Sequence, residues 1–375
     1  MKKASLIISI IIFIISCFMA YDVINRKEEI HFIPTITEID DGVKSIKFKV
    51  DTFYLAIGES EKLNYDIESS KDDYKLTLSS ENEDIVSISD GKIVGVNLGT
   101  SVVTLKSESG KKAEVSVTVT DLIGKPELDD KKKFLPCHAY TEEEAHIIDE
   151  ALRTRVLNKG EGTRAALIET IRFMTLSFKY KVSYFYENGR MHESGVRKAD
   201  GEGRYYHKGL YLSEDKFKDI KVSHKGPAIW GCPLTNLQDH NRYKPGAKMP
   251  NGLDCSGFVT WSLYNSGLDV GDIGAGINDR HKDMSDVGEM HSLTYEYANS
   301  GDYKVGDVIA RWGHTALIAG KDSEYLYIAE SLLKGVRIEK VSYKNPNSSL
   351  YKYYAYINKM DKEYSKNDDY TDMWE

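Results

Sequence analysis

The chain has 375 residues, a net charge of −8 at neutral pH and a pI near 5.8. This length is sufficient for two or three domains, each with its own core. The acidic balance and the lack of a basic helix or patch in the sequence argue against a nucleic-acid-binding protein. Four cysteines in a chain of this length do not indicate a disulfide scaffold.

Residues 1–21 have the composition of an export signal, because Met1-Lys2-Lys3 is followed by an apolar run. Three interpretations compete. Phe18-Met19-Ala20 is a poor cleavage site for a secreted protein, whereas Ile14-Ile15-Ser16-Cys17 resembles a lipobox that would leave Cys17 lipidated. An uncleaved anchor is the third, since about 18 apolar residues just cross a bilayer. We favour attachment to the outer face of the cytoplasmic membrane or the cell wall, with free secretion as the alternative.

Residues 22–42 are polar and predict a linker, and residues 43–121 then alternate as short strands. The expected strands lie at 46–48, 54–56, 62–65, 85–88 and 113–119, and turn signals such as Ser89-Asp90-Gly91 separate them. This spacing predicts a β-sandwich. The run from Ser87 to Val96, with Leu98-Gly99-Thr100, resembles the bacterial Ig-like group 2 domain. That resemblance implies a cell-surface module, which we interpret as a passive spacer.

Residues 122–134 predict a second, charged linker, and residues 135–221 match no family that we recognise. Thr141-Glu142-Glu143-Glu144 has the form of a capping box and predicts a helix to about residue 157. The apolar spacing predicts a second helix over 163–178, and residues 180–186 predict a strand. We interpret residues 135–221 as an extension packed onto the following domain, with a small separate helical domain as the alternative.

Asp254-Cys255-Ser256-Gly257-Phe258-Val259 combines a good N-cap with the start of an apolar helix. Cys255 would lie in the first turn, where free N–H groups and the positive end of the helix dipole favour a thiolate. A thiolate is the nucleophile that a cysteine enzyme needs. The alternative is a small buried cysteine at the start of a core helix.

A second segment strengthens the catalytic interpretation. Residues 304–309 predict a turn and a strand start, and residues 313–320 predict an apolar strand that begins with His314. Residues 325–331 predict its hairpin partner, so His314 is expected to face Glu330 or Ser331. We assign Glu330 as the acceptor of the imidazole Nδ1–H, because a carboxylate stabilises an imidazolium better than a hydroxyl does. A register with Ala319 paired to Tyr325 would set His314 directly opposite Glu330.

The chain resembles the NlpC/P60 family of papain-like cysteine peptidases over about residues 222–360. The matching motifs are Gly226-Pro227-Ala228-Ile229-Trp230-Gly231, Asp254-Cys255-Ser256-Gly257-Phe258-Val259, Val305-Gly306-Asp307-Val308, and His314 before a strand that ends in glycine. Two positions depart from the family, since it usually has tyrosine at Ala228 and glycine at Cys232. A glutamate as the third catalytic residue resembles the related CHAP amidases. The expected architecture is thus multidomain, with an Ig-like sandwich, a helical extension and an α+β papain-like domain.

This resemblance implies a hydrolase of stem-peptide amide bonds in peptidoglycan, namely of the bond from γ-D-glutamate to a diamino acid. It implies the catalytic residues Cys255, His314 and Glu330, and it suggests that Asp254 and Ser256 hold the stem peptide. Trp230 is a further substrate-binding candidate, since it could line a groove together with Tyr205, Tyr206 and Tyr211, but we favour a core position for these aromatic residues. No cofactor or metal is implied, and the expected partners are stem peptides and the membrane.

Several alternatives stay open at this stage. The chain could instead be an inactive wall-binding or adhesive protein, or an amidase or transferase that acts on another amide. Cys137 and Cys232 could pair or stay free. His281, Asp283, Asp286 and His291 could be assembled into a metal site, but their spacing matches no ligand pattern. Residues 361–375 predict a charged, frayed tail.

Overall fold

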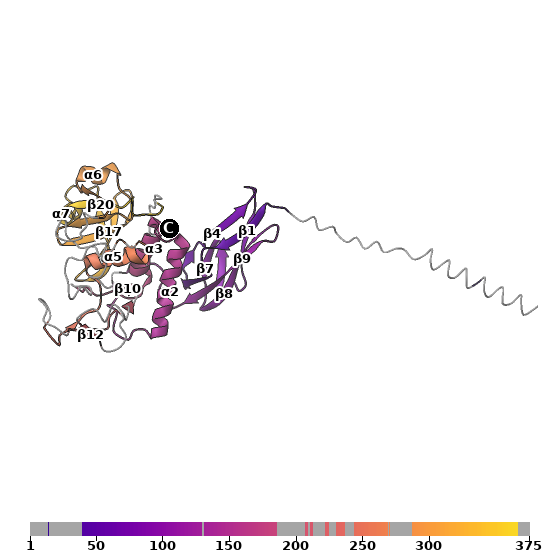
Figure 1. Cartoon of the computed structure of the whole chain (residues 1–375), viewed down its shortest axis with the longest axis horizontal. Helices are drawn as coiled ribbons and strands as arrows, with labels where there is room; N and C mark the ends of the chain where they lie inside the picture. The colour runs from indigo at the N-terminus through magenta and orange to yellow at the C-terminus, as the bar shows by residue number, and fades with distance from the viewer. Residues whose placement is uncertain are drawn as a thin grey trace, which may run out of the picture. The chain divides into compact units, whose positions relative to one another are not determined.

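A computed structural model describes residue 14 and residues 40–129, 131–185, 207–208, 211–212, 222–224, 230–236, 244–268, 270 and 287–366. The fold is mixed and rich in β-structure, with several sheets and few helices (Figure 1). The segment from Asp41 to Glu375 is one compact unit. The predicted signal at 1–21, except residue 14, and nearly all of the predicted linker at 22–42 lie outside the described residues. Among the helices that the structure describes, none is both long and apolar enough to cross a membrane.

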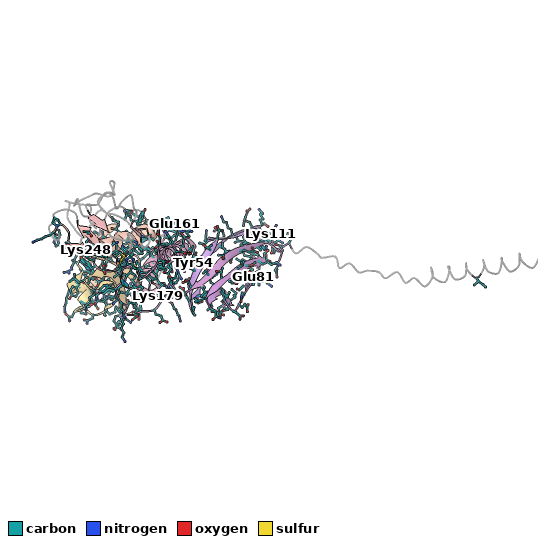
Figure 2. All side chains as sticks on the ribbon, turned by 90° about the horizontal axis from the view of Figure 1, so that it is seen from below. Tyr54, Glu81, Lys111, Glu161, Lys179 and Lys248 are labelled. Atoms are coloured by element: carbon teal, nitrogen blue, oxygen red, sulfur yellow. A yellow bond between two sulfur atoms is a disulfide. The ribbon has the colours of Figure 1, made fainter. Side chains whose placement is uncertain are left out.

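The first part of this unit consists of nine strands in three small sheets. One sheet has the order β2-β9-β8-β5, a second has the order β3-β7-β6, and β1 pairs with β4. The strands are β1 (Val43–Phe48), β2 (Thr52–Ala56), β3 (Ser60–Glu61), β4 (Tyr65–Ser69), β5 (Leu76–Ser80), β6 (Val86–Ser89), β7 (Lys92–Gly95), β8 (Gly99–Ser107) and β9 (Lys112–Thr120). The buried residues of these strands alternate along the chain and form one apolar core, as expected for strands that turn one face to the core and the other to solvent. Glu81 and Lys111 project away from this core (Figure 2).

Sequence reasoning located four of these nine strands, β1, β2, β6 and β9, and the turn between β6 and β7. Ser89 pairs with Lys92, and Asp90 and Gly91 between them both have positive φ, which is the geometry of a tight two-residue hairpin turn. The predicted strand at 62–65 is wrong. Only Tyr65 of these residues lies in a strand, because Leu63 turns into the core while the backbone crosses from β3 to β4. The predicted linker also ends early, since Asp41 is buried and its carboxylate accepts from the N–H groups of Val43 and Ser109.

Two helices follow, and both begin where the sequence predicts. Helix α2 (Glu142–Lys159) has Thr141 as N-cap with a complete capping box to Glu144. Helix α3 (Arg164–Arg172) is capped by Thr163 and continues as a π-helical turn, η1 (Phe173–Ser177). The wider turn closes with a hydrogen bond from Phe178 N to Phe173 O of 2.7 Å.

Buried charges join the sandwich to these helices. Arg155 of α2 is 1% exposed, and its two terminal nitrogens each lie 2.7 Å from an oxygen of Glu59, which precedes β3. The same guanidinium donates to the carbonyl of Tyr54 on β2, a residue labelled in Figure 2. Arg172 of α3 pairs with Glu61 of β3, and Glu169 lies between the two arginines. The sandwich is therefore fixed to α2 and α3 by ion pairs that are shielded from water.

Two predictions for the segments around these helices are wrong. Within the predicted linker 122–134, Ile123 is buried, and Lys132 donates to the carbonyls of Thr175, Leu176 and Phe178 at the end of η1. Burial lowers the pKa of Lys132 to about 8. Of the predicted strand at 180–186, the described residues 180–185 form a single bridge, between Lys181 and Phe134, because their hydrogen bonds go to several separate segments rather than to one strand.

The C-terminal part is built on a six-stranded antiparallel sheet of order β15-β20-β16-β17-β18-β19. Helix α5 packs against β17 and β18, and Figure 1 shows α5 beside β17. The elements of this part are β10 (His207–Lys208), β11 (Tyr211–Leu212), β12 (Val222–His224), β13 (Leu234–Asn236), β14 (Lys248–Met249), α5 (Cys255–Asn265), β15 (Glu289–Ser292), α6 (Tyr295–Ser300), β16 (Val308–Arg311), β17 (His314–Lys321), β18 (Tyr325–Leu332), β19 (Gly335–Ser342), α7 (Ser349–Tyr353) and β20 (Tyr356–Lys359).

The helices α2 and α3 share one hydrophobic core with this sheet, and that core extends to Tyr364. The predicted fraying of residues 361–375 is therefore wrong for 361–366. Arg164 of α3 pairs with Asp361 at 2.7 Å, and the Tyr364 hydroxyl donates to the carbonyl of Gly306 at 2.6 Å. Residues 367–375 lie outside the described part.

We expect Arg155→Leu to lower the free energy of unfolding by about 3–5 kcal/mol, because it leaves the Glu59 carboxylate buried without its partner. Arg153→Gln on the same helix is the matched control, since Arg153 pairs with Glu150 in solvent and such pairs contribute about 0–1 kcal/mol. Urea unfolding of both variants measures the difference. Equal losses in the two variants would contradict the buried-pair explanation.

Candidate active site

Cys255 is the first residue of α5 and is held in a capped helix start. The Asp254 carboxylate accepts from the N–H of Gly257 at 2.6 Å and from the Ser256 hydroxyl at 3.2 Å. Cys255 is 6% exposed, and its sulfur is not in a disulfide. The predicted N-cap is confirmed, and the thiol lies in the turn where the helix dipole favours a thiolate.

The loop before α5 is fastened by backbone contacts to distant segments. Leu253 N donates to Ser183 O at 3.0 Å, and Leu253 O accepts from the Ser331 hydroxyl of β18 at 2.8 Å. Gly252 lies so close to the carbonyl of Ser183 that a Cβ there would approach to 2.0 Å, so this position requires glycine. The segment that the sequence predicted as a strand thus supports the loop that carries Cys255.

His314 and Glu330 form a buried pair. His314 begins β17, Glu330 lies near the end of β18, and the distance from Nε2 to Oε2 is 2.8 Å. Their exposed fractions are 5% and 3%. The sequence predicted this contact, but it assigned the wrong ring nitrogen. Because Glu330 engages Nε2 and an ionised carboxylate can only accept, Nε2 carries the proton and Nδ1 remains as the basic nitrogen.

Two residues that sequence reasoning missed complete the surroundings of Glu330. Arg337 of β19 donates to Oε1 through Nε at 3.0 Å and through Nη2 at 2.7 Å. The Tyr354 hydroxyl, which follows α7, donates to Oε2 at 2.8 Å. Burial raises the pKa of Glu330, but the hydrogen bonds from His314, Arg337 and Tyr354 outweigh it and lower the pKa to about 2. Sequence reasoning could have found Arg337 only from the pairing of β18 with β19, which places Arg337 directly opposite Glu330.

A β-bulge decides which residue of β18 shares a face with His314. Beyond the bulge Gly320 pairs with Tyr327, whereas before it Leu317 pairs with Ala329, so Ala319 is the extra residue. The predicted pairing of Ala319 with Tyr325 is wrong, and counting on from Leu317 places Glu330 opposite Ala316. Glu330 is thus a diagonal neighbour of His314 on the same face. An unbulged ladder in the Gly320 register would put Ser331 on that face instead.

The turn before β16 holds the strand of His314 at this bulge. Gly306 N donates to Ile318 O at 2.7 Å, and Ile318 N donates to Asp307 O at 2.9 Å. The fully buried Asp307 carboxylate accepts from Lys304 N and Met360 N, and Arg164 pairs with it at 2.9 Å. The Val305-Gly306-Asp307 motif therefore has a structural role, because its contacts hold β17 in place.

The three predicted substrate contacts have different surroundings. Trp230 has no exposed surface and packs against Trp261 of α5 with ring centres 5.3 Å apart. It is a core residue, so its assignment to substrate binding is wrong. Asp254 and Ser256 are buried in the helix cap described above, and their role toward a substrate stays a prediction. The residues before Trp230 in the same motif, including Ala228, lie outside the described part.

Cys137 and Cys232 form a disulfide, which settles the question that the sequence left open. Their sulfur atoms and a ring nitrogen of His138 lie within 4.8 Å of one another, but the disulfide occupies both sulfurs. Of the four residues considered for a metal site, only His291 is among the described residues. It lies on β15, next to Glu289, and its ring stacks on Tyr297.

We expect the ionisation of Glu330 to contribute to stability above about pH 4.5 and this contribution to be lost as the pH falls toward 2. Stability decreases as the pH falls because folding lowers the pKa of this carboxyl, so the unfolded chain binds the proton more readily. Urea midpoints of wild type between pH 5 and pH 2.5 should fall more steeply than those of Glu330→Gln. Glu81→Gln, an exposed site, should retain the wild-type slope. A Glu330→Gln slope equal to that of wild type would contradict this assignment.

Comparison with known proteins identifies no family. No family model matches the chain, and no curated protein matches it. Among solved structures it is similar to parts of the S-layer protein SbsC. Domains 4 and 5 match with 20% identity over 21% of this chain and 46% of that one, with a TM-score of 0.19. Domains 4–9 match with 19% identity over 27% and 18%, at 0.20, and domains 5–6 with 19% over 27% and 56%, at 0.18. Likenesses at these TM-scores carry no argument about fold or function.

Proposed function

We propose that the chain is a cysteine peptidase of the NlpC/P60 type that hydrolyses a stem-peptide amide bond in peptidoglycan. The observation that carries the proposal is the buried His314–Glu330 pair at 2.8 Å, in a sheet whose strand β18 also anchors the loop before Cys255. A nucleophile, a base and a residue that orients the base are the three parts of a triad. We also propose that the C-terminal part has a papain-like fold.

The proposed reaction begins with transfer of the Cys255 thiol proton to His314 Nδ1. The thiolate attacks the carbonyl carbon of the amide, and the backbone N–H of Cys255 stabilises the oxyanion. His314 then gives its proton to the leaving amine, which departs as the thioester forms. Water, deprotonated by His314, hydrolyses the thioester and releases the acid and the free thiol. Throughout, Glu330 accepts the Nε2–H and stabilises the imidazolium.

The substrate follows from the sequence resemblance, which implies the bond between γ-D-glutamate and a diamino acid. We also propose that the protein acts outside the cytoplasmic membrane, attached through residues 1–21. The Cys137–Cys232 disulfide supports this location, because structural disulfides persist mainly in oxidising compartments.

We expect Cys255→Ser and His314→Ala each to lower the rate of stem-peptide hydrolysis by at least about a thousandfold, because nucleophile and base act as a unit. The rate is measured by chromatography of the products from a defined tripeptide. Circular dichroism and thermal unfolding provide the control for folding. A variant that keeps more than a few per cent of the wild-type rate would exclude its residue from the catalytic pair.

We expect a graded response at the third position. Glu330→Gln should lower kcat partially, since its amide oxygen can still accept the Nε2–H, and Glu330→Ala should lower kcat more. Ser331→Ala, the neighbouring residue on the opposite face, removes the hydrogen bond to Leu253 that anchors the loop before Cys255, and it should lower kcat less than Glu330→Ala does. Steady-state kinetics on the same tripeptide measures all three. Wild-type kcat in Glu330→Ala, together with a crippled Ser331→Ala, would overturn the assignment.

A further inference from the structure

Four large apolar side chains are exposed at one end of the C-terminal sheet. Trp312 lies in the turn between β16 and β17 and is 65% exposed, and Leu333 lies in the turn between β18 and β19 and is 86% exposed. Because neighbouring strands of this sheet are antiparallel, both turns lie at the same end. Tyr353 is exposed beside Arg311 at the end of β16, and the ring of Phe134 is exposed against the first residue of β19. The fold thus brings together exposed apolar side chains from four separate segments.

A positive charge adjoins each of these apolar residues in the chain. The exposed cations are Lys133, Arg311, Lys334 and Lys352. None of them forms an ion pair within the described part of the chain, and the carboxylates of Glu330 and Glu339 both accept from Arg337 instead. The whole chain carries a net charge of −8, so this concentration of free positive charge is local. We call these four cations and the four apolar residues beside them the turn patch.

The composition of the turn patch fits the surface of an anionic lipid bilayer. Tryptophan and tyrosine concentrate at the interface between membrane and water, and lysine and arginine are attracted to anionic headgroups. Leu333 gains free energy only from a partner that removes it from water. A hydrophilic polyanion, such as an anionic wall polymer, would engage the cations and leave Leu333 hydrated. Side chains on separate turns can each enter a fluid bilayer, so the partner needs no matching groove.

We propose that the turn patch binds an anionic phospholipid bilayer, with its apolar side chains in the interface and its cations on the headgroups. This contact is separate from the proposed attachment through residues 1–21, and it does not depend on the proposed hydrolysis. His314 begins β17 two residues after Trp312. Binding through the turn patch would therefore bring the base of the candidate active site close to the membrane surface.

The first test measures the fluorescence of Trp312 in the full chain, mixed with an excess of vesicles that contain a nitroxide-labelled lipid. The difference between wild type and Trp312→Phe isolates this residue from the other tryptophans. We expect quenching in vesicles with phosphatidylglycerol and much less in vesicles of phosphatidylcholine alone, because only the anionic surface attracts the cations. Leu98→Trp in the Trp312→Phe background is the control. It places a tryptophan on the exposed turn between β7 and β8, which should stay unquenched.

Variants of the turn patch measure the contribution of its charges and of its apolar residues. Lys334→Gln combined with Lys352→Gln should lower the ratio of docked to free chains about thirtyfold, at about five- to sixfold for each lysine. The matched control combines Lys92→Gln on β7 with Lys106→Gln on β8, which changes the net charge equally and should keep the wild-type ratio. Leu333→Asn should lower the ratio about tenfold although it retains every charge. Thermal unfolding of each variant checks that the fold is intact.

Three results would overturn the proposal: no quenching of Trp312, equal quenching at positions 98 and 312, or an equal loss in the two lysine variants. A fourth uses immobilised poly(glycerol phosphate). If this polymer retains wild type but not the Lys334→Gln, Lys352→Gln variant, and vesicles leave Trp312 unquenched, the partner is an anionic wall polymer instead of a bilayer.

Discussion

The carboxylate of Glu330 is the interaction on which the geometry of the site depends. A buried anion is costly unless donors surround it, and here His314, Arg337 and Tyr354 supply four hydrogen bonds. These donors come from β17, β19 and the segment after α7, so the packing of three elements converges on one group. The same contacts fix the ring of His314 and the proton on Nε2. A single buried charge therefore fixes the orientation of the His314 ring and joins the elements around it.

A second set of buried charges links the N-terminal strands to α2 and α3, and links α3 to the C-terminal sheet. Glu59 and Glu61 at the edge of the sandwich hold α2 and α3, and Arg164 of α3 holds the Asp307 turn that pairs with β17. In each of these ion pairs, both side chains are at most 9% exposed. The strands β1–β9 are therefore fixed to their neighbours by buried ion pairs, and the passive spacer role expected from sequence stays a prediction. Removal of these strands would expose charged groups of α2 and α3 that now have partners.

Local features were predictable from sequence, and nonlocal ones were not. The caps at Thr141 and Asp254 and the strand that begins with His314 depend on neighbours within a few residues, so propensity and periodicity were sufficient. The register of β17 with β18 depends on one extra residue at Ala319, which no alternation of apolar residues reveals. Lys132 and Tyr364 lie in charged stretches typical of linkers and tails, but partners far along the chain, at η1 and Gly306, bury them. The donors of Glu330 were missed for the same reason.

The Cys137–Cys232 disulfide has a consequence for the integrity of the chain in a compartment that contains proteases. The bond joins residues 95 positions apart. A single cut between the end of η1 and Cys232 leaves one covalent molecule, in which the fragment with α2 and α3 stays linked to the fragment with α5 and the C-terminal sheet. The half that contains Glu59 and the half that contains Cys255 would thus be kept at a high effective concentration. Nicking would be visible on a denaturing gel only after reduction, and the two pieces would remain able to share their common core.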